Sequence, residues 1–420
     1  MRFEQLSSHS IRAATACAIA LGFSIPVSVA LDNVLLALVL LSGTIGTVFH
    51  RRFEMLRMSP VAVIALSLFA LLALGISWSS HFAEGFRILG KYADLAFVPI
   101  FAALFREPAM RRNAGAFFVA ALLLTLALSF LMRAGTIPNG PLFVGNSDQP
   151  EVFKKYLTQS ILMAIGAYFF ALLACHAQSG RARCVWAILS ALAAINVAFM
   201  LSGRSGQIML FALAFYGCYL GWRWRGVGWA SSAILMVVVL LLSGMPGTSS
   251  PPQQGSGVRD GSLGAVIHDF ESWRAGQPIK TSTAQRLDYA VNSLAIVREH
   301  PLTGVGTGGF AAAYAKQVQG TNLEATVNPH NEYLNIAVQI GIPGLLAAVV
   351  LFFLVWRHAR GLPTALERDL ARGLAVAFGI GSLFNSLLMD HVEGLFFAWS
   401  VGVLFGGYDP ARMSVTAKTP

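Results

Sequence analysis

Three basic residues of this chain stand out because their types and sequence contexts suit chemistry on an anionic substrate. They are Arg204 in Leu-Ser-Gly-Arg-Ser-Gly, Arg286 in Thr-Ala-Gln-Arg-Leu-Asp, and His330 in Asn-Pro-His-Asn-Glu-Tyr-Leu-Asn. The topology predicted from the apolar segments places all three on one face of a membrane, opposite to most of the positive charge. We therefore expect them to form a site that binds an anionic lipid.

The sequence around His330 predicts the start of a helix. Asn328 is a suitable N-cap, Pro329 suits the first turn, and His330 then falls in that same turn of an apolar helix. The partial positive charge of a helix amino terminus disfavours an imidazolium ion and leaves a neutral ring that can accept a proton. His330 is thus suited to act as a general base. A histidine that only anchors the helix at the membrane interface is an equally compatible interpretation.

Arg204 lies in a short predicted turn between two apolar segments, with Gly203 and Gly206 on either side. A charge so close to the membrane is costly unless it is paired or used. The alternative is that Arg204 extends to lipid headgroup phosphates.

Arg286 offers the planar, bidentate guanidinium that best fits a phosphate group. Nearby carboxylates leave a structural alternative open, because Asp288, Asp269 or Glu271 could pair with it.

Two further pairs of cations belong to the same predicted face. Arg87 and Lys91 are four residues apart, on one side of a short amphipathic helix predicted after Trp78. The apolar side of that helix carries Phe82, Phe86 and Leu89. Either pair could make ordinary lipid-headgroup contacts, which is the favoured interpretation for Lys154 and Lys155. A phosphate clamp is favoured for Arg87 and Lys91, because the aromatic side would hold their helix at headgroup depth.

The composition is that of a polytopic membrane protein. Of the 420 residues, 55% are hydrophobic and only 12% are charged, whereas a soluble protein has about twice that charged fraction. The formal net charge of +10 is explained by loop residues that fix membrane orientation, so no nucleic-acid partner is expected.

Apolar segments long enough to cross roughly 30 Å of hydrocarbon recur along the chain. We predict about 12 transmembrane helices, at residues 12–30, 33–49, 60–78, 93–106, 114–132, 158–176, 185–202, 206–222, 229–244, 334–356, 373–389 and 393–408. With a cytoplasmic amino terminus, 18 of the 30 basic residues fall on the inner face, as the positive-inside rule requires. Residues 1–30 also resemble a cleavable signal peptide, but the next apolar segment follows at once, which favours an uncleaved helix.

The predicted organisation has three parts: spans one to nine in residues 1–244, a periplasmic loop subdomain in 245–333, and spans ten to twelve with a short cytoplasmic tail in 334–420. Within the loop, residues 283–298 show helical periodicity, with Thr283 as a plausible N-cap. A glycine-rich turn at 301–310 and a short helix at 311–318 follow. The glycines predict a tight turn rather than a phosphate-binding loop, and no external segment carries a metal-ligand motif.

Together, the Arg-Ser-Gly turn at 204–206, His-Pro-Leu-Thr-Gly-Val-Gly at 300–306 and His-Asn-Glu-Tyr-Leu at 330–334 resemble the O-antigen ligase and polymerase superfamily. The specific part of the resemblance covers about 200–340. It implies an all-α membrane glycosyltransferase of GT-C-like architecture in the bacterial inner membrane, with its active site facing the periplasm.

The resemblance also implies the reaction. A glycan would pass from undecaprenyl diphosphate to a sugar hydroxyl of lipid A-core, with inversion and without a metal or other cofactor. Arg204 and Arg286 would bind the diphosphate, and His330 would activate the acceptor hydroxyl. O-antigen polymerases and protein O-oligosaccharyltransferases share this donor chemistry. We favour the ligase because the loop is compact and the tail after Tyr408 is short. A lipid or oligosaccharide transporter is the alternative from another class.

Overall fold

A computed structural model describes residues 2–45, 59–137, 140, 143–223, 263–275 and 281–415. Every regular element in these residues is a helix, which confirms the all-α prediction. The predicted ninth span, 229–244, and the Ser/Pro/Gly segment that follows it lie outside the described residues.

The membrane part consists of helices that come before and after the polar segment that precedes Glu332. They are α1 (Arg2–Val27), α2 (Val29–Ile45), α4 (Pro60–Gly75), α5 (Phe82–Lys91), α6 (Asp94–Leu104), α7 (Pro108–Arg133), α8 (Tyr156–His176), α9 (Gly180–Ile195), α10 (Arg204–Arg223), α15 (Glu332–His358), α16 (Ala365–Gly381), α17 (His391–Phe405) and α18 (Ala411–Val415). Short helical turns extend α4, α9 and α15: a 3-10 helix η1 (Ile76–Trp78), a π-helix η2 (Asn196–Met200) and a 3-10 helix η3 (Ala359–Gly361).

Local sequence signals set several of these boundaries. Pro60 and Pro108 occupy the first turns of α4 and α7, where the missing N–H costs nothing. Thr364 and Glu367 form a capping box that starts α16, and this box satisfies two backbone donors reciprocally.

Six described helical segments are long and apolar enough to cross a membrane, and two more, Val29–Gly43 and His391–Phe405, are apolar but shorter. The protein is therefore a multi-pass helical membrane protein, as its composition predicts. The count of 12 is not reproduced within the described residues. The clearest difference concerns 373–389, because α16 ends at Gly381 and residues 382–390 are irregular.

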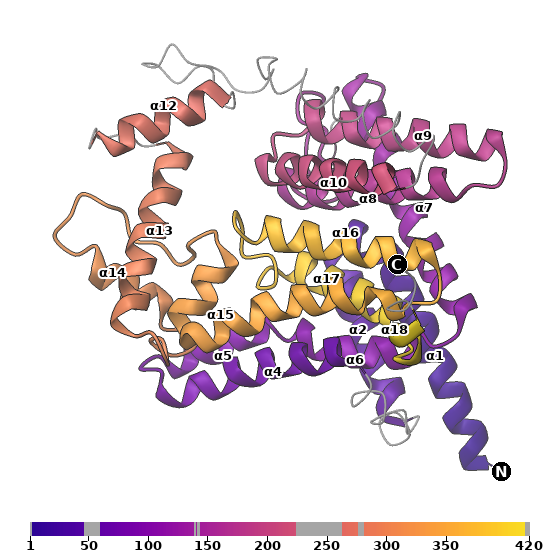
Figure 1. Ribbon diagram of the computed structural model, residues 1–420, viewed down its shortest axis with the longest axis horizontal. Helices are drawn as coiled ribbons and strands as arrows, with labels where there is room; N and C mark the ends of the chain where they lie inside the picture. Colours follow the sequence, from indigo (N-terminus) through magenta and orange to yellow (C-terminus); the bar gives the residue numbers. More distant parts are fainter. Residues whose placement is uncertain are drawn as a thin grey trace.

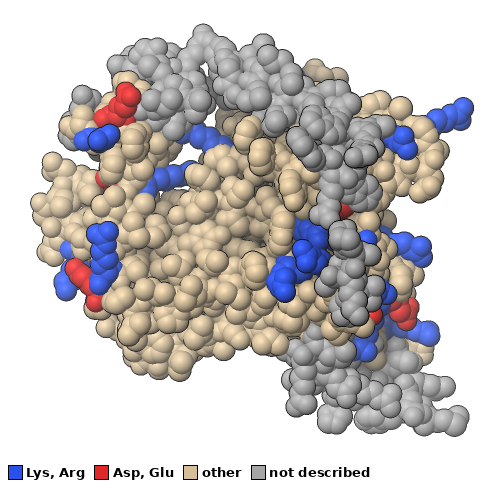
Figure 2. Space-filling view, viewed as in Figure 1, with Lys and Arg blue, Asp and Glu red and all other residues tan. Residues whose placement is uncertain are grey.

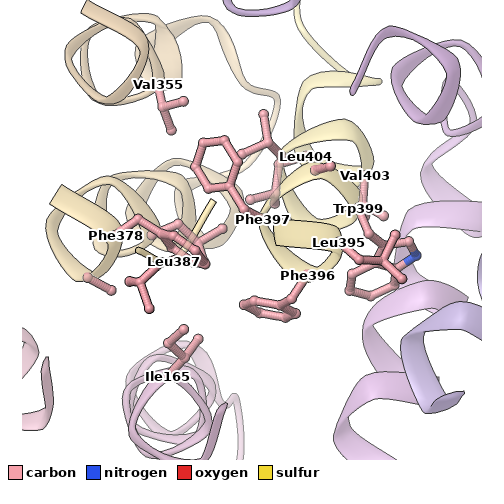
Figure 3. Close-up of a cluster of buried hydrophobic side chains, with 14 of the residues drawn as sticks. Ile165, Val355, Phe378, Leu387, Leu395, Phe396, Phe397, Trp399, Val403 and Leu404 are labelled. Carbon is pink, nitrogen blue, oxygen red and sulfur yellow. The ribbon is translucent and has the colours of Figure 1, made fainter. Parts of the chain in front are cut away.

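Helix α17 is the centre of the apolar core. Its residues from Val392 to Phe405 are all buried. The ring of Phe397 lies 4.9 Å from that of Phe378 on α16, and the ring of Phe396 lies 5.0 Å from that of Phe118 on α7. Figure 3 shows the rings of Phe378, Phe396 and Phe397 with Ile165 of α8 and Val355 of α15 around them. The core thus joins helices from both halves of the chain.

The polar segment before α15 contributes three helices: α12 (Leu263–Arg274), α13 (Ser282–Glu299) and α14 (Phe310–Gln317). Figure 1 shows them together at one end of the molecule, while the first turns of α1 and the short α18 lie toward the other. The predicted helix at 283–298 is confirmed, but its N-cap is Thr281, whose side chain accepts a hydrogen bond from Ala284 N, rather than Thr283.

The glycine-rich turn at 301–309 fastens this segment to the membrane helices. Gly304, Gly306 and Gly308 have positive φ, which glycine adopts without a Cβ penalty. A Cβ at Gly304 would overlap the backbone of Gln339, and one at Gly308 would overlap the backbone at Gly85. The turn therefore packs backbone against backbone, as the sequence predicts.

Lys154 does not reach the lipid headgroups as predicted. Its side chain is only 7% exposed, and Nζ lies 3.8 Å from Asp32 Oδ2 on α2. Val152, two residues earlier, is fully buried as well, because this stretch folds inward before α8. A partner 122 positions earlier in the chain thus withdraws the lysine from the membrane surface.

Candidate active site

Arg204 begins α10 in a turn that is pressed against α8. A Cβ added to either Gly203 or Gly206 would overlap Ser160 Oγ, so both glycines are needed for this close approach. Arg204 is only partly exposed. Its Nη1 donates a hydrogen bond to Ser282 Oγ on α13, at 3.2 Å. The turn after η2 is thereby connected to the helix that carries Arg286.

Arg286 is half-buried on α13 and lies close to Arg204. Burial lowers the pKa of Arg286, and the positive charge of Arg204 lowers it further, whereas Tyr156 at the start of α8 opposes the shift. Two guanidinium groups held so near each other repel, and an anion bound between them would remove that repulsion.

The carboxylates that the sequence offers as partners of Arg286 are not used in that way. Asp288 Oδ1 instead accepts a hydrogen bond from Trp273 Nε1 of α12, at 2.8 Å. Within the described part of the chain, Arg286 forms no ion pair with an acidic side chain.

His330 stands just before α15 rather than in its first turn, so this sequence prediction is wrong. The helix begins at Glu332, and its N-cap is Asn331, whose side chain accepts a hydrogen bond from Leu334 N. Asn328 has a different role, since its Oδ1 accepts from His330 N at 2.8 Å. This bond accompanies a left-handed backbone at His330, with φ 52°, which is uncommon for a residue with a side chain.

The imidazole of His330 faces α13. Its ring stacks on Tyr289, with centroids 6.3 Å apart and planes at 29°. The protein atoms around the ring lower the pKa of His330, and the charge of Arg286 lowers it further. A pKa below the ordinary value of about 6.5 leaves the ring neutral at pH 7. A neutral ring is what the sequence-based prediction of a general base requires, and here it is favoured by burial and by the charge of Arg286.

Arg204, Arg286 and His330 thus form one cluster, built by α10, α13 and the segment before α15. Figure 2 shows basic side chains inside a hollow between the part of the molecule formed by α12 and α13 and the part formed by α8 to α10. The cluster combines two cations with a neutral imidazole, which suits a reaction that produces a negatively charged leaving group.

Residues 189–349, which include all three residues, match the family model described as O-Antigen ligase. Residues 189–349 are thus identified as an O-antigen ligase family domain. The resemblance seen in the sequence is thereby confirmed at the level of the ligase and polymerase superfamily. No curated protein sequence matches the chain.

The other two predicted clamp residues lie apart from the cluster of the O-antigen ligase domain, on α5. Arg87 Nε donates to Glu84 Oε2 at 2.7 Å, so the guanidinium of Arg87 is paired with a carboxylate one helical turn away. Lys91 lies near Asp390 and opposes the rise that burial causes in the pKa of Asp390. Among the described residues, no hydrogen bond or ion pair joins Arg87 or Lys91 to the cluster.

Two members of the cluster were missed from the sequence. Ser282 and Tyr289 lie four residues before and three after Arg286, a spacing that places all three on one face of a helix. That periodicity is visible in the sequence, but it indicates a site only once the partners of this face, Arg204 and His330, are known.

Glu332 of the His-Asn-Glu-Tyr-Leu motif is the other residue missed. It is fully buried, accepts a hydrogen bond from Tyr92 Oη, and accepts another from Leu388 N at 2.7 Å. The motif therefore couples His330 to an anchored carboxyl group two residues later. Among the described residues, no group of three or more His, Cys, Asp or Glu side chains is arranged to hold a metal ion.

Proposed function

We propose that the protein is an O-antigen ligase that transfers a glycan from undecaprenyl diphosphate to a sugar hydroxyl of lipid A-core. The observation that carries the proposal is the cluster of Arg204, Arg286 and His330. The charge of Arg204 acts on Arg286, and the charge of Arg286 acts on His330. These are the three residues that the family resemblance assigns to the donor and the acceptor.

The two arginines would bind the diphosphate of the donor. Breaking the bond between the anomeric carbon and the phosphate oxygen leaves the electron pair on that oxygen. Guanidinium groups fixed beside it stabilise the developing charge without reorganising at the moment of reaction. In this proposal they supply the positive charge that a metal ion supplies in other phosphate-transfer sites.

His330 would take the proton of the acceptor hydroxyl while the acceptor oxygen bonds to the anomeric carbon. A base on the side opposite to the leaving diphosphate gives inversion at that carbon. The neutral ring required for this step is favoured by the lowered pKa of His330. The proton remains on the imidazole until it is released to water.

The proposal also includes placement in the cell. The cluster lies at the end of the molecule that carries α12 to α14 (Figure 1), within the predicted loop subdomain 245–333 and its surroundings. We place that end in the periplasm, with the chain crossing the bacterial inner membrane several times. Both substrates would then reach the site from the outer leaflet.

Reconstitution with different acceptors tests this function. Purified protein in liposomes would receive an undecaprenyl-diphosphate-linked glycan together with lipid A-core, a second copy of the donor, or an acceptor protein. A glycan-linked lipid A-core product supports the ligase. Extension of the donor glycan would instead indicate a polymerase, and transfer to protein would indicate an oligosaccharyltransferase. Movement of the donor across the bilayer without any product would indicate a transporter.

A further inference from the structure

The connection between α16 and α17 is the irregular stretch 382–390, called here the α16–α17 turn. It is deeply buried for a connection: Ser382, Asn385 and Ser386 are at most 3% exposed. Buried polar side chains need hydrogen-bond partners. The side-chain partners of Asn385 and Ser386 belong to the two halves of the cluster, the Arg204 turn and the histidine segment.

The first half is the Arg204 turn. Asn385 Nδ2 donates a hydrogen bond to Ser205 Oγ, and both side chains are buried. Ser205 directly follows Arg204, so this bond fixes the first turn of α10. A short buried bond of this kind limits how far Arg204 can move relative to the α16–α17 turn.

The second half is the histidine segment. Ser386 Oγ donates to Asn328 Oδ1 at 2.7 Å, and the same oxygen accepts from His330 N at 2.8 Å. Ser386 therefore orients the side chain that holds the left-handed backbone of His330. Such a conformation persists only where the surroundings determine it strongly, and Ser386 is part of those surroundings.

Further bonds fasten the residues after His330 to the same turn. Glu332 N donates to Ser382 O at 2.8 Å, and Asn331 Nδ2 donates to Leu383 O at 3.1 Å. Leu388 N donates to Glu332 Oε2 at 2.7 Å. The backbone of this turn therefore binds the residues around the start of α15 and does not continue α16 as a helix.

We propose that the α16–α17 turn sets the position of His330 relative to Arg204, with Asn385 as the positioning residue for the arginine and Ser386 as the positioning residue for the histidine. This inference rests on the proposed function. It adds that residues beyond 349, outside the part matched to the family, determine the geometry of the site. Asn385 and Ser386 are adjacent in this turn. Through Arg204 and His330 they set the distance between the diphosphate and the base, which must act on the same sugar.

Double-mutant cycles test the two assignments. If a residue acts only through a partner, replacing it has no further effect once that partner has been removed, so the effects of the two substitutions are not additive. Ser386→Ala should lower kcat for glycan transfer roughly 5- to 30-fold, the factor for one or two kcal/mol, and leave donor affinity unchanged. In a His330→Ala background it should have no further effect on the residual rate. Ser386→Thr, which keeps the hydroxyl, should recover most of kcat. Asn385→Ala should weaken donor affinity, but not in an Arg204→Ala background.

Ser190→Ala is the matched control, since Ser190 is buried and its hydroxyl donates to Ala167 O at 2.8 Å, in a contact between α9 and α8. A purely structural role for Ser386 would give the same loss in both backgrounds, and that result would overturn the proposal. So would a kcat for Ser386→Ala equal to that of Ser190→Ala.

A second measurement needs no transfer activity, so it separates failure of this inference from failure of the proposed function. NMR titration of isotope-labelled histidine follows the pKa of His330 in the intact protein. Ser386→Ala should raise that pKa toward its ordinary value, because the ring moves away from Arg286, while Ser190→Ala should leave it unchanged. An unaltered pKa in Ser386→Ala would contradict the inference. Absence of transfer by the unmodified protein with every acceptor would contradict only the function.

Discussion

Burial and the charge of Arg204 both lower the pKa of Arg286, although Arg204 begins a membrane helix and Arg286 lies in the polar segment before α15. Ser282 connects Arg204 to the helix of Arg286, since Arg204 Nη1 donates to the hydroxyl of Ser282, which is one turn before Arg286 on α13. The fold therefore brings together two like charges that the sequence separates. The proposed chemistry depends on this pair and on the imidazole beside it.

Replacing either arginine should weaken donor binding as well as turnover. A hydrogen bond to a charged group contributes roughly 1.5–3 kcal/mol, so Arg204→Ala or Arg286→Ala should cost about 10- to 100-fold in affinity for the lipid diphosphate. Lysine should recover little at either position if the contact is bidentate. Arg298→Ala, an exposed position on the same helix as Arg286, is the control. Unaltered affinity in both arginine variants would rule out the diphosphate clamp.

The pH dependence of glycan transfer should show the effect of Arg286 on the pKa of His330. The free protein has a lowered pKa at His330, so kcat/KM should fall only when pH drops below about 6.5. A bound diphosphate offsets the charge of Arg286, which favours the imidazolium and raises that pKa. The acid limb of kcat should therefore lie at higher pH than the limb of kcat/KM. Coincident limbs would show that Arg286 and the donor do not act on His330.

Glu332 should matter for stability. Glu332→Ala leaves Leu388 N–H and Tyr92 O–H without this acceptor in a buried site, at roughly 1–3 kcal/mol for each buried donor left unpaired. Thermal unfolding in detergent should show a clearly lower Tm for this variant than for Glu299→Ala, which changes an exposed glutamate on α13. Equal Tm values would mean that the carboxyl group anchors nothing.

Reporter fusions test the orientation of the cluster. A reporter inserted within 250–330 should be periplasmic, whereas fusions near Arg223 or Arg368 should be cytoplasmic, because basic loops remain inside. The opposite result would move the proposed site away from lipid-linked substrates in the outer leaflet.

Hydropathy and helical periodicity predict much of this fold because long apolar segments have few alternatives in a bilayer. The same reasoning fails at 373–389. Leu383, Leu387 and Leu388 continue the apolar pattern of α16, yet the backbone leaves the helix there and the N–H groups of Leu388 and Met389 bind Glu332. The competing acceptor is 56 positions before Leu388 in the chain, so no local pattern indicates it.

The candidate site could likewise be predicted only in part from the sequence. Residue type and charge pointed to Arg204, Arg286 and His330, because a cation near the membrane calls for an explanation. The backbone at His330 was not predictable, since Asn328 and Asn331 are both good N-caps in the sequence. Contact with Ser386, 58 positions later, engages Asn328 and leaves Asn331 to start the helix. Tertiary contacts, not local preference, therefore determine which asparagine caps α15.

The most direct test of the central claim is transfer by His330→Ala in liposomes that contain the lipid-diphosphate-linked glycan and lipid A-core, with donor affinity measured on the same preparation. A missing base should reduce kcat by about 10²- to 10⁴-fold and leave donor affinity nearly unchanged. The exposed His268 of α12 provides the control, His268→Ala, which should retain full activity. Near-normal transfer by His330→Ala would contradict the general-base role of His330.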